Sequence, residues 1–287
     1  VILAAPPHEH LIQSLVDEVI SPATPILKSH RYEHQKAVPI SLVQQEILLD
    51  CQLAGDVPVY NVVFTLRIGC SVDQESLQEA FNLLARRHAI LRTAFSFQED
   101  GTVQRIYESS TVPLMFADLR DLEGQNREVE ANRLATEEAC RPFQLSRPPL
   151  VRALLMRMSD TDHRLDVTIH HAIADGWSIF RIIVPELRIL NKAIQRGTSA
   201  SLKELPMQYV DFALWQHQQK QKETIESNLA YWKQRLSGMS MLELPTDRAR
   251  PPIRTFRGSS VRFTLSKELS AGLNDLSQSF GATMYMT

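Results

Sequence analysis

The stretch DVTIHHAIADGWS, residues 166–178, decides how the rest of the chain is interpreted. Its first residues alternate polar and apolar side chains, which is typical of a β-strand, and an aspartate and a glycine follow where that strand should end. Because side chains alternate between the two faces of a strand, His171 continues the apolar face of Ile169. His170 lies on the opposite face with Thr168. The two histidines are therefore predicted to do different jobs.

Several interpretations of this histidine pair are open at this point. The simplest is a structural pair at a strand end. A metal site would use His171 and Asp175, but no further cluster of His, Cys or acidic residues suggests the remaining ligands. A Ser-His-Asp triad lacks a nucleophile-elbow sequence. A histidine that handles a proton during acyl transfer fits the near-neutral pKa of a free imidazole.

Strand and helix patterns alternate on both sides of this stretch, which predicts a mixed α/β protein. Strands are expected at 59–68, 91–97, 102–108, 150–158, 163–171 and 259–265, and helices at 41–50, 71–88, 126–140, 177–194, 206–238 (in two pieces) and 267–281. A short polar turn joins strands 150–158 and 163–171, which predicts an antiparallel hairpin. A purely parallel doubly wound sheet is therefore disfavoured.

The helix boundaries carry their own signals. Ser41 is a candidate N-cap, and Ser71 stands in capping-box spacing with Gln74. Ser178 is expected to cap the helix that follows Gly176. Pro185 lies inside that helix and is expected to kink it, because proline removes one backbone hydrogen bond.

Composition and charge narrow the classes of function. The chain has 287 residues, enough for one large domain or two modest ones, and its 44% hydrophobic and 22% charged residues are ordinary for a globular protein. A net charge of -2 implies no broad attraction to nucleic acid or to a membrane surface. No apolar run reaches the length of a membrane span.

Three cysteines stand far apart, at Cys51, Cys70 and Cys140. Their odd number and wide spacing argue against a disulfide framework and fit a reducing compartment, so a cytoplasmic location is expected. We expect all three to be small buried hydrophobes.

The segment HHAIADG, residues 170–176, matches the HHxxxDG signature of nonribosomal peptide synthetase condensation domains. The shorter HxxxDG pattern is shared by the wider family of acyltransferases with the chloramphenicol acetyltransferase-like fold. Further motifs follow the condensation-domain order from about residue 39 to the end of the chain. They are SLVQQ (41–45, with Val43 in place of the usual alanine), RHAILRTAF (87–95, with Ala89 in place of the usual glutamate), RPFQLSRPPLVRALL (141–155) and QYVDFALWQ (208–216). The segments 229–252 and 255–266 resemble the connection into the second lobe.

This resemblance implies a fold and a domain organisation. The fold would be α/β, an α+β sandwich in which a chloramphenicol acetyltransferase-like lobe holds a mixed, largely antiparallel sheet with flanking helices. A leader would occupy 1–36 and the N-terminal lobe with the HHxxxDG loop 37–200. Connecting helices would follow at 201–238, and the beginning of a truncated second lobe at 239–287.

The resemblance also implies an activity. A condensation domain is an acyltransferase that forms an amide bond between a donor acyl or peptidyl thioester and an acceptor aminoacyl thioester. No cofactor would be bound directly, because carrier proteins deliver both substrates on phosphopantetheine arms. The implied partners are the donor and acceptor carrier domains and a neighbouring adenylation domain of a multidomain synthetase, with neither nucleic acid nor membrane.

Site residues are carried over by position in the motif. His171 matches the functional histidine, as a base or as a group that positions the amine. Gly176 would leave room for the reacting carbonyl, and its N–H would help to bind the oxyanion. No metal is implied.

The remaining motif residues would support the site. His170 would face away and support the loop, and Asp175 would brace it. Arg92 is the candidate partner of Asp175, through a two-point ion pair. Ser178 would line the substrate tunnel.

Two other functions stay open. One is a non-catalytic, condensation-like platform for docking other proteins, against which the intact HHxxxDG argues. The other is a different HxxxDG acyltransferase that makes esters or uses coenzyme A, against which the doubled histidine and the 87–95 and 208–216 motifs argue. An incomplete second lobe would also expose apolar surface, which leaves open whether the chain is active by itself.

Overall fold

The computed structural model describes residues 37–218, 222–251, 255–256, 258–259, 261 and 263–287. The leader expected at 1–36 lies outside these described residues. The chain divides into two compact units, one ending at Ser240 and the other comprising Met241–Thr287. Each unit is described by itself.

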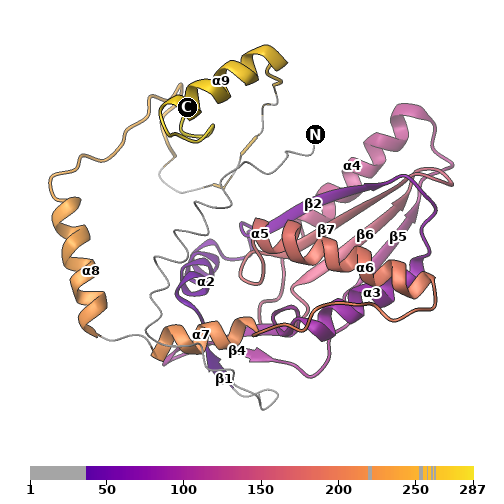
Figure 1. Ribbon diagram of the computed structural model, residues 1–287, viewed down its shortest axis with the longest axis horizontal. Helices are drawn as coiled ribbons and strands as arrows, with labels where there is room; N and C mark the ends of the chain where they lie inside the picture. Colours follow the sequence, from indigo (N-terminus) through magenta and orange to yellow (C-terminus); the bar gives the residue numbers. More distant parts are fainter. Residues whose placement is uncertain (1–36, 219–221, 252–254, 257, 260, 262) are drawn as a thin grey trace. The chain divides into compact units, whose positions relative to one another are not determined.

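A four-stranded sheet forms the centre of the first unit (Figure 1). Its central pair is β7 (His163–His170) and β6 (Val151–Arg157), which form the antiparallel hairpin that the sequence predicts. β2 (Asn61–Ile68) pairs antiparallel with the other edge of β7, and β5 (Leu114–Asp118) runs parallel to β6. The sheet is therefore mixed and largely antiparallel, as expected.

A second, smaller sheet has the order β1-β4-β3 and is antiparallel throughout. It consists of β1 (Ala37–Pro39), β4 (Gly101–Ile106) and β3 (Thr93–Gln98). The sequence patterns missed both β1 and β5. β1 has three residues, and β5 is a short apolar run without alternation, so neither carries a period long enough to detect.

Helices cover both faces of the larger sheet (Figure 1). On one face lie α3 (Gln74–Arg87) and α6 (Val184–Gln195), which pack against each other and bury leucine side chains in the main core. On the other face α4 (Gly124–Cys140) buries Ala131 and Ala135 against β6. Since both faces of β7 are covered, its polar side chains are buried along with its apolar ones, except for the partly exposed Arg164.

Further helices of this unit are α2 (Leu42–Ala54), α7 (Tyr209–Gln218) and α8 (Lys222–Arg235). Ser41 caps α2 as predicted. Its hydroxyl accepts the Gln44 N–H at 3.2 Å, and its own N–H donates to Gln44 Oε1 at 3.0 Å, which completes a capping box.

The cap predicted for α3 is wrong. The helix begins at Gln74, and the residue before it, Asp73, accepts the Ser76 N–H at 2.9 Å. Ser71 lies outside the helix. A carboxylate at this position also interacts favourably with the positive end of the helix dipole.

The helix after Gly176 has three parts rather than one kinked span. A short α5 (Gly176–Ser178) leads into a π-helical turn, η2 (Ile179–Ile183), in which the Val184 N–H donates to the Ile179 carbonyl. Pro185 follows in the first turn of α6. Because residues 176–184 before it are already helical, the missing N–H of Pro185 leaves one carbonyl of the preceding turn without its intrahelical donor, and the π-helical turn lies directly before this proline.

The second unit contains α9 (Lys267–Ser279), whose N-cap Ser266 accepts the Leu269 N–H at 3.2 Å. The strand expected at 259–265 is wrong for the residues described there, which are not paired in a sheet. A β-pattern becomes a strand only when a neighbouring strand takes up its backbone hydrogen bonds. The described part of this unit offers no such neighbour.

The cysteines also depart from expectation. Cys51 is half-buried, but Cys70 and Cys140 are exposed, and all three are free thiols. Cys70 follows a strand end and Cys140 ends α4, so both lie where the chain meets solvent. Within the described part of the chain, no helix is both long and apolar enough to cross a membrane.

The corrected cap of α3 gives a direct test. We expect Asp73→Ala to lower the free energy of unfolding by about 1 kcal/mol, because the Ser76 N–H loses its acceptor. Ser71→Ala is the matched control and should leave stability unchanged. Urea unfolding followed by circular dichroism measures the free energy of unfolding of each variant. A larger loss of stability in Ser71→Ala than in Asp73→Ala would show that Ser71 is the N-cap after all.

Candidate functional site

The backbone of the histidine pair is held from both sides of β7. The His170 N–H donates to the Leu150 carbonyl at 2.9 Å, and the His171 N–H donates to the Tyr60 carbonyl at 2.8 Å. These bonds extend the pairing of β7 with its two neighbours by one residue. Strand alternation therefore persists through both histidines and points their rings in different directions.

His170 is enclosed in protein, with 4% of its surface exposed. Its Nδ1 accepts the Ala172 N–H at 3.2 Å, and its Nε2 lies 3.6 Å from the Cys51 sulfur. A backbone N–H can only donate, so Nδ1 carries no proton. The neutral ring is then the Nε2–H tautomer, which donates to Cys51.

Burial fixes the charge state of this contact. It lowers the pKa of His170 to about 4, with a smaller effect in the same direction from the neighbouring His171. Burial likewise raises the pKa of Cys51 to about 11, helped by the nearby charge of Asp50. At neutral pH the imidazole is uncharged and the thiol keeps its proton.

An arginine that sequence reasoning missed supports His170 from a distance. The Phe143 ring meets His170 edge-on at a centroid distance of 6.2 Å, and the Arg152 guanidinium lies 4.0 Å above that same Phe143 ring. Arg152 also donates to the Glu138 carboxylate at 3.0 Å and to the carbonyls of Glu138 and Arg141. The available signal was a charged residue inside the apolar strand pattern of VRALLMR, since a buried arginine needs partners.

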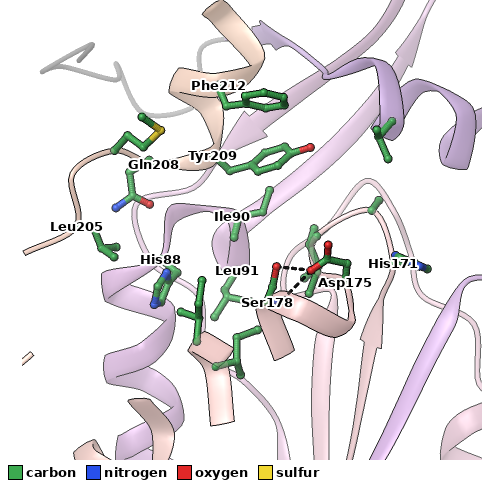
Figure 2. A pocket seen from close by; sticks show the side chains of 17 residues that line it. His88, Ile90, Leu91, His171, Asp175, Ser178, Leu205, Gln208, Tyr209 and Phe212 are labelled. Carbon is green, nitrogen blue, oxygen red and sulfur yellow. Dashed lines mark hydrogen bonds between the residues drawn. The ribbon is translucent and has the colours of Figure 1, made fainter. Parts of the chain in front are cut away.

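His171 lies at the edge of a cavity of about 420 Å³, with His88 toward the opposite edge (Figure 2). The cavity is lined by the 171–178 loop, by the 3₁₀ helix η1 (Ala89–Arg92), by segment 205–212 and by parts of α2 and η2. Among the described residues, neither ring nitrogen of His171 has a hydrogen-bond partner, and Nδ1 is buried. No carboxylate in the described part of the chain is hydrogen-bonded to this imidazole, so nothing there supports a Ser-His-Asp triad.

Asp175 caps the short helix α5. Its Oδ1 accepts the Ser178 N–H at 2.7 Å and the Ser178 hydroxyl at 2.6 Å (Figure 2). The prediction that Ser178 is the cap is therefore wrong, since Ser178 donates to the cap. Burial by itself would raise the pKa of Asp175, but the two bonds from Ser178 outweigh it and the pKa is lowered.

The predicted pair of Arg92 with Asp175 is wrong. The Arg92 Nε donates to the Ala85 carbonyl at 2.9 Å, and its Nη1 donates to the carbonyls of Tyr107 and Glu108. Carbonyls in the last turn of a helix and beyond a strand end lack regular partners, so they attract a guanidinium. Arg92 therefore joins the end of α3 to the end of β4.

Gly176 is the first residue of α5, and its N–H has no partner within the helix. A Cβ built at this position meets no atom within 4 Å, and its backbone is outside the left-handed region. Packing within the described residues therefore does not require glycine here. Gly176 itself is not among the residues that line the cavity, although its neighbour Asp175 is.

The other polar groups of the cavity bind one another across elements. The Glu186 carboxylate of α6 contacts His88 Nε2 at 2.7 Å and Arg87 Nε at 3.0 Å. The Gln208 side chain donates to the Arg87 carbonyl at 3.0 Å and accepts the Ala89 N–H at 2.9 Å. The Tyr209 hydroxyl lies 2.7 Å from that of Ser41. These bonds hold the cavity wall together.

Among the residues that the structure describes, no three His, Cys, Asp or Glu side chains gather closely enough to hold a metal ion. His171 and Asp175, the pair considered from the sequence, have no third ligand near them there. The arrangement favours proton handling and hydrogen bonding over metal chemistry.

Comparison with known proteins shows which family and which relatives this chain is similar to. The model of the condensation domain matches residues 34–287. Phosphinothricin tripeptide synthetase PhsC of Streptomyces viridochromogenes is 39% identical over 284 residues, which cover 99% of this chain and 26% of that protein. Chondramide synthase cmdD of Chondromyces crocatus is 39% identical over 254 residues, covering 88% of this chain and 6% of that protein. The chain thus spans about a quarter or less of these relatives.

Solved structures agree on the fold. The complex of the X-domain and OxyB from teicoplanin biosynthesis matches 91% of this chain and 56% of that chain, with a TM-score of 0.75 and 25% identity. The starter condensation domain of rhizomide synthetase RzmA matches 75% of this chain and 48% of that chain, with a TM-score of 0.67 and 20% identity. The chain spans about half of each.

The buried, neutral His170 predicts a pH dependence. Its pKa is near 6.5 when unfolded and about 4 when folded. The unfolded chain therefore binds the proton first as the pH falls. We expect the free energy of unfolding to decrease by about 2 kcal/mol from about pH 7.5 to about pH 5 through this group.

His170→Asn removes the titrating group and is the comparison. Urea titrations at each pH should give the variant a flatter profile than the wild type. Equal slopes for the two proteins would show that His170 is not held neutral by burial.

Proposed function

Because the chain belongs to the condensation-domain family of nonribosomal peptide synthetases, we propose that it forms amide bonds between carrier-bound thioesters. The donor is an acyl or peptidyl thioester and the acceptor is an aminoacyl thioester. The observation that carries this proposal is His171. Its backbone is fixed by a hydrogen bond to Tyr60, and its ring meets the cavity with both nitrogens unpartnered in the described part of the chain.

The proposed step balances without a cofactor. The acceptor amine nitrogen attacks the donor carbonyl carbon, so that a C–N bond forms and the C–S bond breaks. The amine gives up one proton, and the thiol of the departing arm ends with one. Nδ1 of His171 is buried, so substrate would reach the ring through Nε2. There His171 takes the amine proton or holds the amine in position.

The other motif residues support this step in the proposal. The Gly176 N–H is the candidate donor to the oxyanion of the tetrahedral intermediate, and Ser178 lines the cavity beside it. His170 and Asp175 fix the two ends of the loop between them. Arg92 contributes by holding η1, which forms the facing wall of the cavity.

The proposed partners are the carrier domains that present donor and acceptor on phosphopantetheine arms, and a neighbouring adenylation domain. Support comes from the relatives, which are far longer than this chain. In this proposal residues 37–200 form the N-terminal lobe and 201–238 the connecting helices. Residues 239–287 begin a second lobe.

A docking platform is the second candidate. One matched structure is a complex of an X-domain with another protein, OxyB, which makes a binding role conceivable for this fold. The His171 ring meets the cavity, and no hydrogen bond among the described residues uses its nitrogens, which favours catalysis over docking alone. An ester-forming acyltransferase would use the same histidine with a hydroxyl acceptor.

We expect His171→Ala, in a complete condensation domain carrying this chain, to lower amide formation by roughly 10²–10⁴-fold, the usual contribution of a general base. Mass spectrometry of the acceptor carrier measures the product. His88→Gln is the matched control, because His88 lines the same cavity but is bound to Glu186. It should keep activity within a small factor.

Unchanged turnover in a folded His171→Ala variant would remove the catalytic assignment. Ester product with a hydroxyl acceptor, and no amide, would instead indicate an ester-forming acyltransferase. Binding of both carriers without any product would select the docking platform.

A further inference from the structure

We propose that the cavity beside His171 receives an uncharged, apolar side chain or acyl group of one of the two substrates. This inference rests on the proposed function and adds the substrate class to it. The cavity volume of about 420 Å³ falls within the range of small-molecule sites. This volume has room for one aliphatic or aromatic group beside the reacting thioester of the proposed reaction.

The walls of the cavity are mainly apolar and come from several elements. α2, η1, η2 and segment 205–212 each contribute. Their apolar lining residues include Val43, Ile90, Leu91, Ile182, Met207 and Phe212. Since these side chains are held on helices and on a braced segment, the apolar wall exists before any substrate enters.

The polar lining groups are already engaged by the protein. His88 is bound to Glu186, Tyr209 to Ser41, and Gln208 to two backbone groups of the 87–89 segment. A polar or charged substrate group would have to break these bonds or remain without a partner, which is unfavourable in an apolar site. His171 is left for the reacting amine.

Asp175 is the one lining group that argues for another occupant. Its carboxylate is exposed and accepts two bonds from Ser178, yet it keeps a negative charge. A substrate cation such as a lysyl side chain would be attracted to it. The test must therefore separate an apolar from a cationic occupant.

Val43 offers a way to change the cavity without unfolding the chain. It lines the cavity from α2, but 57% of its surface is exposed, so its size is not fixed by core packing. Val43→Trp narrows the cavity. Leu53→Trp is the matched control, since Leu53 lies on the same helix, is 79% exposed and is outside the cavity lining.

The experiment is an NMR titration of the chain with N-acetylcysteamine thioesters of alanine, leucine, lysine and glutamate. Each buried methylene contributes about fourfold in affinity, so leucine should bind at least about tenfold more tightly than alanine. Lysine and glutamate should bind no more tightly than alanine. The free-amine and N-acetylated forms distinguish an acceptor from a donor group.

Val43→Trp should weaken leucine binding by about fivefold or more, and Leu53→Trp should leave it unchanged. If the lysine thioester bound as tightly as the leucine thioester, the occupant would be a cation attracted by Asp175, and the proposal would be overturned. Equal binding of the leucine and alanine thioesters would also overturn it. An unaffected Val43→Trp variant would do the same. Leucine preference in the titration, together with no amide product from the complete condensation domain, would refute only the proposed function, because binding and turnover are measured separately.

Discussion

The position of the histidine pair depends on the hydrogen-bonded registers of β7 with β2 and β6. The last bonds of these ladders are made by His170 and His171 themselves, to Leu150 on one side and Tyr60 on the other. A slip by one residue would exchange the faces of the two rings and put the buried imidazole at the cavity. Because β7 is buried on both faces, such a slip would also misplace every core residue of the strand. The register is therefore fixed by the whole core, and the placement of the two imidazole rings follows from it.

The two faces of β7 place its two histidine side chains in different environments. On the closed face, desolvation keeps His170 neutral, and its two nitrogens are used by Ala172 and Cys51. Arg152 secures this face through Phe143 and is itself paired with Glu138, which offsets the cost of burying a guanidinium. On the cavity face, neither ring nitrogen of His171 has a hydrogen-bond partner among the described residues, and only Nε2 is accessible to a substrate because Nδ1 is buried.

Long periodic segments of the fold were predictable from the sequence, and local partners were not. The alternation over 163–171 was enough to place the two histidines on different faces, because successive side chains of a strand point to opposite sides of the sheet. The N-cap of α3 depended on a two-residue difference between Ser71 and Asp73, which periodicity does not resolve. Arg92 found carbonyls rather than Asp175, and backbone acceptors carry no signature in the sequence. The pattern at 259–265 is a proper strand pattern, but pairing depends on a neighbour rather than on the pattern.

The loop after the histidines separates charges in a way that suits amide formation. In the proposed reaction the amine nitrogen becomes positive while the carbonyl oxygen becomes negative. The Asp175 Oδ1 accepts hydrogen bonds from the N–H and the hydroxyl of Ser178, which is the third residue of α5. The N–H of Gly176, at the first residue, is left without an intrahelical acceptor and is available to a negative oxygen. His171, four residues before Asp175, lines the cavity and in the proposed reaction is the base or the hydrogen-bond partner for the nitrogen. A single short loop, fixed at one end by strand pairing and at the other by its own cap, thus carries both groups that the proposed reaction would use.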